Sequence, residues 1–156
     1  MSTFKSLTDQ ESAVLTPLLA AGQSLAGASL VVEDVQDLNT EITQAMGEIG
    51  LMILIGMVPF DNAADKSAGA VIAACKQQIL IGEVPAIWRN AADTNVHCQD
   101  AARIVAKALQ GLLLDNQQRL HVVSGTPLGT FKGEIKTNPS VFQYYRLELE
   151  TVIAFT

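Results

Sequence analysis

The carboxyl-terminal segment 141–155 most limits how this chain can fold, because its side chains alternate between apolar and polar. A period of two is typical of a β-strand with one face buried and the other exposed. Such a strand needs neighbouring strands and an apolar layer over its buried face. The predicted buried positions are Tyr145, Leu147, Leu149, Ile153 and Phe155, and the opposite positions include Arg146, Glu148 and Glu150.

Periodic patterns along the rest of the chain predict what surrounds that strand. The predicted helices are 8–22, 38–48 and 96–114, and the further predicted strands are 28–35, 51–58, 70–88, 119–125 and 130–136. The order α-β-α-β-β-α-β-β-β is typical of an α+β fold, with a mixed or antiparallel sheet and helices packed on one face. We expect residues 1–156 to form a single domain, because 49% of the 156 residues are hydrophobic and only 17% are charged.

Several local patterns predict where these elements begin and bend. The sequence TDQE at 8–11 has the form of a capping box, so we expect the first helix to begin there. Pro17 predicts either a kink or a restart capped by Thr16. Pro85 indicates an edge or a bend near the end of its strand, and residues 89–95 read as a turn-rich loop.

Acidic residues are concentrated in the first part of the chain. Residues 1–65 hold nine acids and one base, a net charge of −8, and residues 66–156 hold seven acids and nine bases, a net charge of +2, which together give −6. In a self-associating protein, an acidic surface facing a less acidic one favours head-to-tail contact. In a monomer the same distribution is chance, and both interpretations stay open. The overall acidity argues against specific nucleic-acid binding.

Cysteine usage and hydrophobic patterning favour a cytosolic protein. Cys75 and Cys98 form no CxxC pair, and no secretory signal precedes them, so we expect reduced thiols. The most apolar run, 49–60, is shorter than the roughly 20 residues that a membrane span needs. That run predicts a buried strand, and we expect no membrane partner.

Residue types that carry catalysis are sparse. His97 and Cys98 are adjacent, but neighbours on a helix point about 100° apart and do not share a site easily. We find no spacing typical of a metal site and no glycine-rich phosphate loop, so we expect no cofactor, no metal and no enzyme activity. A small enzyme that uses Cys98 with His97 and His121 is an alternative that the sequence leaves open.

Residues 77–114 carry a family resemblance. The segment reads QQILIGEVPAIWRN at 77–90, followed by a loop and by DAARIVAKALQGL at 100–112. It resembles small prophage-encoded tail proteins, in which a strand ends in an E-N-P-x-x-N-R-like turn before an A-x-x-(I/V)-A-x-x-(L/V)-x-x-x-L helix. The apolar segment 51–60 and the terminal strand 144–155 follow the same order. The nearest likeness is to tail-terminator and tail-completion proteins of long-tailed phages.

This resemblance implies an α+β structural protein that forms a ring, commonly of six subunits, at the head-proximal end of the tail tube. Its expected partners are further copies of itself, the tail tube and the head–tail connector, and its expected locations are the virion tail and the host cytoplasm during assembly. A closed ring needs two different surfaces on each subunit. The candidate subunit contacts are Asp61, Asp65, Trp88, Arg89, Arg146, Glu148 and Glu150. A monomeric protein-binding module that uses a sheet edge or the Trp88–Arg89 loop is the competing interpretation.

Overall fold

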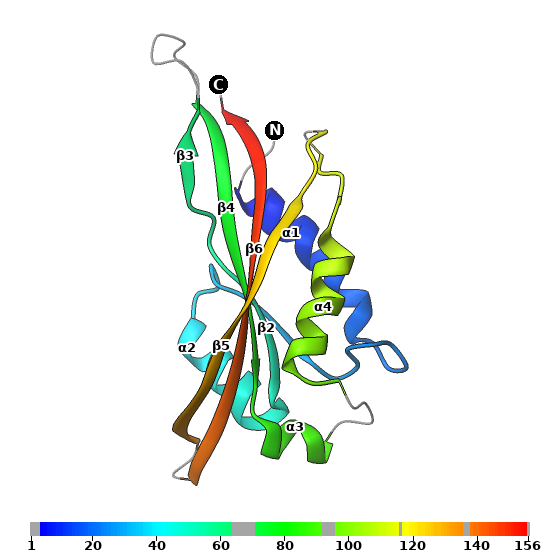
Figure 1. Ribbon diagram of the computed structural model, residues 1–156, viewed down its shortest axis with the longest axis vertical. Helices are drawn as coiled ribbons and strands as arrows, with labels where there is room; N and C mark the ends of the chain where they lie inside the picture. Colours follow the sequence, from blue (N-terminus) through cyan, green and yellow to red (C-terminus); the bar gives the residue numbers. More distant parts are fainter. Residues whose placement is uncertain (1–3, 64–70, 92–95, 116, 136–137, 156) are drawn as a thin grey trace.

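The computed structural model describes residues 4–63, 71–91, 96–115, 117–135 and 138–155 (Figure 1). It confirms an α+β fold with a mixed sheet. The helical elements are α1 (Phe4–Leu15), η1 (Thr16–Leu19), α2 (Leu38–Gln44), η2 (Ala45–Ile49), α3 (Pro85–Ala91) and α4 (Cys98–Leu109). The strands are β1 (Ser29–Val32), β2 (Leu51–Ile55), β3 (Phe60–Asn62), β4 (Val71–Glu83), β5 (His121–Ile135) and β6 (Asn138–Phe155).

Within the described residues, six strands form one sheet in the order β1-β2-β4-β6-β5, with β3 paired to β4 beyond the end of β2. β1 and β2 are parallel, and the other pairs are antiparallel. β1 and β3 therefore lie on one side of the sheet, and β5 forms the edge on the other side.

β5 is one strand where the sequence predicts two. Its register with β6 shifts between Val122 and Ser124 and again between Pro127 and Gly129. These irregularities are β-bulges, which let the strand continue past residues that break a regular ladder. Pro127 is tolerated because an edge strand needs no outward-facing N–H group.

The predicted strand 70–88 is wrong at its end. β4 stops at Glu83, and Pro85 opens the short helix α3 instead of bending an edge strand. Proline is favoured in the first turn of a helix, because the amide hydrogen that it lacks has no partner there. The predicted loop from residue 89 consequently begins as the last residues of α3, and 92–95 lie outside the described residues.

The predicted capping box is also wrong. α1 includes residues on both sides of Thr8, whose hydroxyl donates to the carbonyl of Lys5 within the helix. Glu11 is fully buried rather than folded back on the helix end. Near Pro17 the chain restarts as the 3₁₀ helix η1, with Leu15 and not Thr16 in the capping position.

Two apolar clusters lie on opposite faces of the sheet. In β2, Leu51, Ile53 and Ile55 belong to the larger cluster, and Met52 and Leu54 belong to the smaller one. Figure 1 shows α1 and α4 over the first face and α2 against the second. The expectation of helices on one face therefore describes α1 and α4, while α2 and η2 cover part of the opposite face through the smaller cluster.

The distal parts of β5 and β6 form a two-stranded ribbon. β4 reaches only as far as the pair Glu83–Gln143, whereas β5 and β6 stay paired to Ile135–Asn138. Figure 1 shows this ribbon projecting past the helices. The molecule is thus elongated along the strand direction.

Candidate interaction surfaces

The structure brings three of the sequence-predicted contact residues together on β6. Arg146, Glu148 and Glu150 lie on the face opposite the buried Leu147 and Leu149. Arg146 Nε lies 3.7 Å from Glu148 Oε1, and the Ser124 hydroxyl donates to Glu148 Oε2 at 3.1 Å. This face, which we call the open face, is a row of charged and polar side chains across three strands.

Other charged residues join the open face through the strand register. Glu150 is opposite Lys76 of β4 and His121 of β5. Asp61 of β3 is exposed and opposite Ala74, which places it on the same face as Lys76. Asp65, a further candidate, lies outside the described residues.

Trp88 and Arg89 lie in α3 and not in a loop. The Trp88 side chain is 2% exposed, and its indole N–H donates to the carbonyl of Val96 at 2.7 Å. Trp88 therefore belongs to the core of this chain and offers no surface to a second subunit, which corrects its prediction as a contact residue. Of Arg89 the structure gives the backbone position in α3.

The candidate enzyme residues are separated by the sheet. Cys98, the first residue of α4, is buried against β4, whereas His121 lies on the open face beside Glu150. Burial, reinforced by the nearby Glu83, raises the pKa of the Cys98 thiol to about 12, which opposes formation of a nucleophilic thiolate. The pairing of Cys98 with His121 as its base is therefore wrong.

His97 and Cys98 instead take part in holding the buried Glu83. The carboxylate of Glu83 lies 3.2 Å from His97 Nδ1 and accepts the backbone N–H of Cys98 at 3.2 Å. The Cys98 thiol donates to the carbonyl of Ile81 at 3.3 Å. A carboxylate at the start of α4 also complements the positive end of the helix dipole. These contacts fasten α4 to the end of β4.

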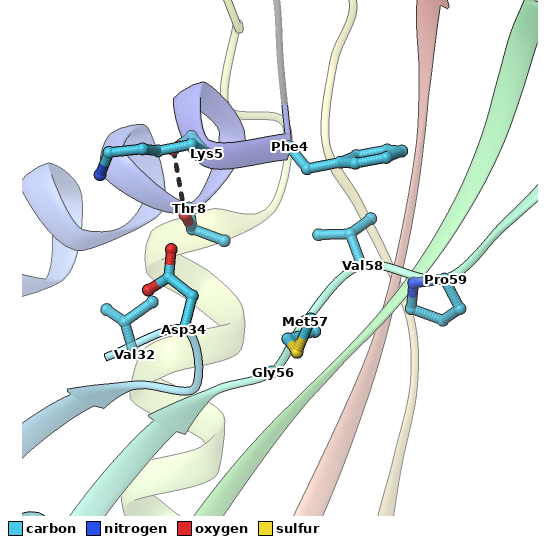
Figure 2. A pocket seen from close by; sticks show the side chains of 9 residues that line it. All are labelled: Phe4, Lys5, Thr8, Val32, Asp34, Gly56, Met57, Val58 and Pro59. Carbon is cyan, nitrogen blue, oxygen red and sulfur yellow. Dashed lines mark hydrogen bonds between the residues drawn. The ribbon is translucent and has the colours of Figure 1, made fainter. Parts of the chain in front are cut away.

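An apolar pocket of about 460 Å³ lies between the start of α1, the end of β1 and the chain that leaves β2. Figure 2 shows its lining residues, with Phe4 and Val58 on one side and Lys5, Thr8 and Asp34 on the other. We call it the α1–β2 pocket. Met57 on its wall is 64% exposed, and Phe60 just beyond it is 46% exposed.

The α1–β2 pocket escapes prediction from the sequence. Residues 51–58 read as one continuous buried strand, but β2 ends at Ile55. The Gly56 N–H still donates to the carbonyl of Gln78 at 3.0 Å, and the chain leaves the sheet after it. Gly56 is needed at that point, because a Cβ there would lie 2.5 Å from the carbonyl oxygen of Gln78. In the sequence the apolar run continues past the end of β2, from Met57 to Phe60. Apolar residues beyond those that the strand buries are a sequence signal of this surface.

A second exposed apolar surface lies at the β5 edge. Val123 occupies the bulge between Val122 and Ser124 and is 54% exposed. Leu113, bridged to Arg119 just before β5, is 47% exposed. We call Leu113 and Val123, with the exposed bases Arg103, Lys107 and Arg119, the β5-edge surface.

Among the described residues, no group of three or more His, Cys, Asp or Glu side chains could hold a metal ion. No helix of the described part of the chain has the length and apolar character of a membrane span.

Comparison with known proteins gives matches among solved structures. No protein-family model matches this chain, and no curated protein matches it. Among the chains of solved structures that match, one comes from the virion of a native gene transfer agent particle. The two chains are 20% identical, the match covers 90% of this chain and 93% of that chain, and the TM-score is 0.35.

Proposed function

We propose that this chain is a non-catalytic structural protein of a phage or prophage tail, of the terminator or completion type. Its copies associate head to tail into a ring at the head-proximal end of the tail tube, where they contact tube and connector proteins. The sequence resemblance of residues 77–114 to tail-terminator and tail-completion proteins supports the assignment to the tail.

The observation that carries the proposal is a pair of different exposed apolar surfaces on the two sides of one sheet. The α1–β2 pocket lies beside β2, and the β5-edge surface lies at the far edge. A ring requires two unlike surfaces on each subunit, whereas a simple binding module requires one. The structure therefore supports head-to-tail association over the binding-module alternative.

The proposed absence of catalysis rests on how the candidate chemical groups are used. Glu83, His97 and Cys98 hold one another at the start of α4. His121 is on the opposite face of the sheet. These residues therefore make structural contacts within the chain.

Negative-stain electron microscopy of the purified protein tests this proposal. We expect annular particles with a central hole, and their frequency should rise with protein concentration. Particles that remain at the size of a single subunit at every concentration would contradict ring formation and would favour the monomeric binding module.

A further inference from the structure

We propose that the α1–β2 pocket of one copy receives the β5-edge surface of a second copy of this chain. This inference rests on the proposed function and names the contact through which the ring would close. It assigns Met57 to one side of the interface and Val123 to the other.

The pocket side is apolar and open. Phe4, Val32, Val58 and Pro59 line a volume of about 460 Å³, and Met57 is largely exposed on its wall. Large exposed apolar side chains around a concave site are typical of interaction surfaces rather than of ordinary exterior. Covering this site removes apolar area from water, which favours association.

The β5-edge surface presents two exposed, branched apolar side chains. Val123 is the extra residue of a β-bulge, so it interrupts the ladder at the strand that has no further neighbour. It shares a groove of about 380 Å³ with Arg103 of α4. Leu113 adds a second exposed apolar side chain just before β5.

Side-chain docking suits this edge better than strand addition. The second bulge and Pro127 break the regular row of backbone groups that an incoming strand would need. Side chains that project from a broken edge can instead enter a pocket, as Val123 and Leu113 would.

The two surfaces carry net charges of opposite sign, which favours contact between them. Near the pocket, Asp34 lines the wall, Glu33 accepts the backbone N–H of Met57 at 2.7 Å, and the Lys5 amine is paired with Asp9 at 3.1 Å. The charges of these four residues sum to −2, from three acids and one base.

The β5-edge surface carries the opposite sign. Arg103 and Lys107 are exposed one turn apart on α4, and Arg119 is exposed opposite Leu113. Asp100 is paired with Arg103 at 3.7 Å, and Asp115 is exposed in the same turn as Leu113, so three bases and two acids give +1. Attraction between unlike surfaces favours pocket-to-edge contact, and repulsion between like surfaces opposes pocket-to-pocket and edge-to-edge contact. Association is therefore directional.

Two variants, each with one of the two surfaces altered and the other intact, test the contact. Met57→Asp places a charge on the pocket wall, and Val123→Asp places one on the edge. Both positions are more than half exposed, so the fold should persist, which circular dichroism and thermal unfolding check. We expect each variant alone to sediment as a monomer. An equal mixture should form a dimer and stop there, because each pair then retains one intact pocket and one intact edge.

A substitution on the distal ribbon of β5 and β6 provides the matched control. Val141→Asp makes the same change at an exposed valine outside both proposed surfaces and should leave the wild-type oligomer intact. Glu150→Lys tests the open face as the competing contact. If Met57→Asp and Val123→Asp assemble like the wild type while E150K does not, the proposed contact is overturned and ring formation survives through the open face. If the wild type itself stays monomeric at all concentrations, both the contact and the ring are overturned.

Discussion

At the scale of single residues, Glu11 links the stability of the fold to pH. Its carboxyl group is fully buried between α1 and the sheet, and among the described residues neither of its oxygens has a hydrogen-bond partner. Burial raises its pKa from 4.5 to about 8, and the adjacent Gln77 side chain offsets only part of that increase. Glu11 is therefore protonated in the folded protein at neutral pH.

The Glu11→Gln variant should remove a pH dependence. The stability associated with the protonated carboxyl is fully present below pH 4.5, and it declines as the pH rises toward about 8, because only the unfolded chain releases the proton in that interval. Urea unfolding measured at several pH values should therefore show a flatter profile for E11Q than for the wild type. Parallel profiles would mean that Glu11 titrates normally.

Trp88 supplies a second test at this scale. Replacing it with phenylalanine keeps an aromatic ring in the core but leaves the Val96 carbonyl without its indole donor, a loss of about 1 kcal/mol. Replacement with alanine should cost about 3–5 kcal/mol because it also opens a cavity. Denaturant unfolding measures both losses. Since Trp88 lies in the core, W88F should sediment like the wild type, and a loss of the oligomer without a loss of stability would restore its role as a contact.

At the scale of elements, Gly50 sets the approach of α3 to the start of β2. Its φ is +92°, and a Cβ at this position would lie 2.6 Å from the backbone nitrogen of Trp88. Its carbonyl also accepts the N–H of Val84 at 2.7 Å. The turn between η2 and β2 and the start of α3 are therefore built against each other.

Comparison of Gly50→Ala with Gly22→Ala isolates that packing. Gly22 has a similar φ of +81°, but a Cβ there would meet no atom within 4 Å. G22A should lose only the backbone strain of about 1–2 kcal/mol, and G50A should lose clearly more because α3 must shift. Chemical denaturation measures both losses. Equal losses would show that α3 does not constrain Gly50.

The elements that the sequence predicts well are those whose pattern is complete within one segment. The alternation of 141–155 and the apolar stripe of 96–114 lead directly to β6 and α4, because burial of one face decides both. The formation of α3 and of the single long strand β5 depends on packing and pairing with other segments of the same chain. Pro85 suits a helix start as well as a strand edge, and the bulges in β5 arise from its pairing with β6.

The candidate site was predictable only in part for the same reason. The shared face of Arg146, Glu148 and Glu150 follows from strand alternation alone. The α1–β2 pocket needs the packing of α1 against the chain leaving β2, and those residues are far apart in the sequence. No local pattern shows that Trp88 is buried, and the apolar run that continues past β2 to Phe60 does not by itself show that Met57 is exposed.

At the scale of the whole molecule, the charge difference between the two parts of the chain acquires a location. Asp34 lines the α1–β2 pocket, and Glu33 accepts the backbone N–H of Met57 on its wall. Arg103 lies in the groove beside Val123, and Lys107 and Arg119 are exposed near it. In the sheet, β4 and β6 lie between β2, beside the pocket, and β5, which carries Val123. An overall charge of −6 therefore conceals a directional distribution suited to head-to-tail association.

The most direct test of this account is the sedimentation of the wild-type protein over a wide concentration range, at low and at high salt. We expect a discrete oligomer at low salt that shifts toward the 16.6 kDa subunit at high salt, because mobile ions screen the attraction between the two surfaces. A single species at the mass of one subunit under all conditions would contradict head-to-tail assembly.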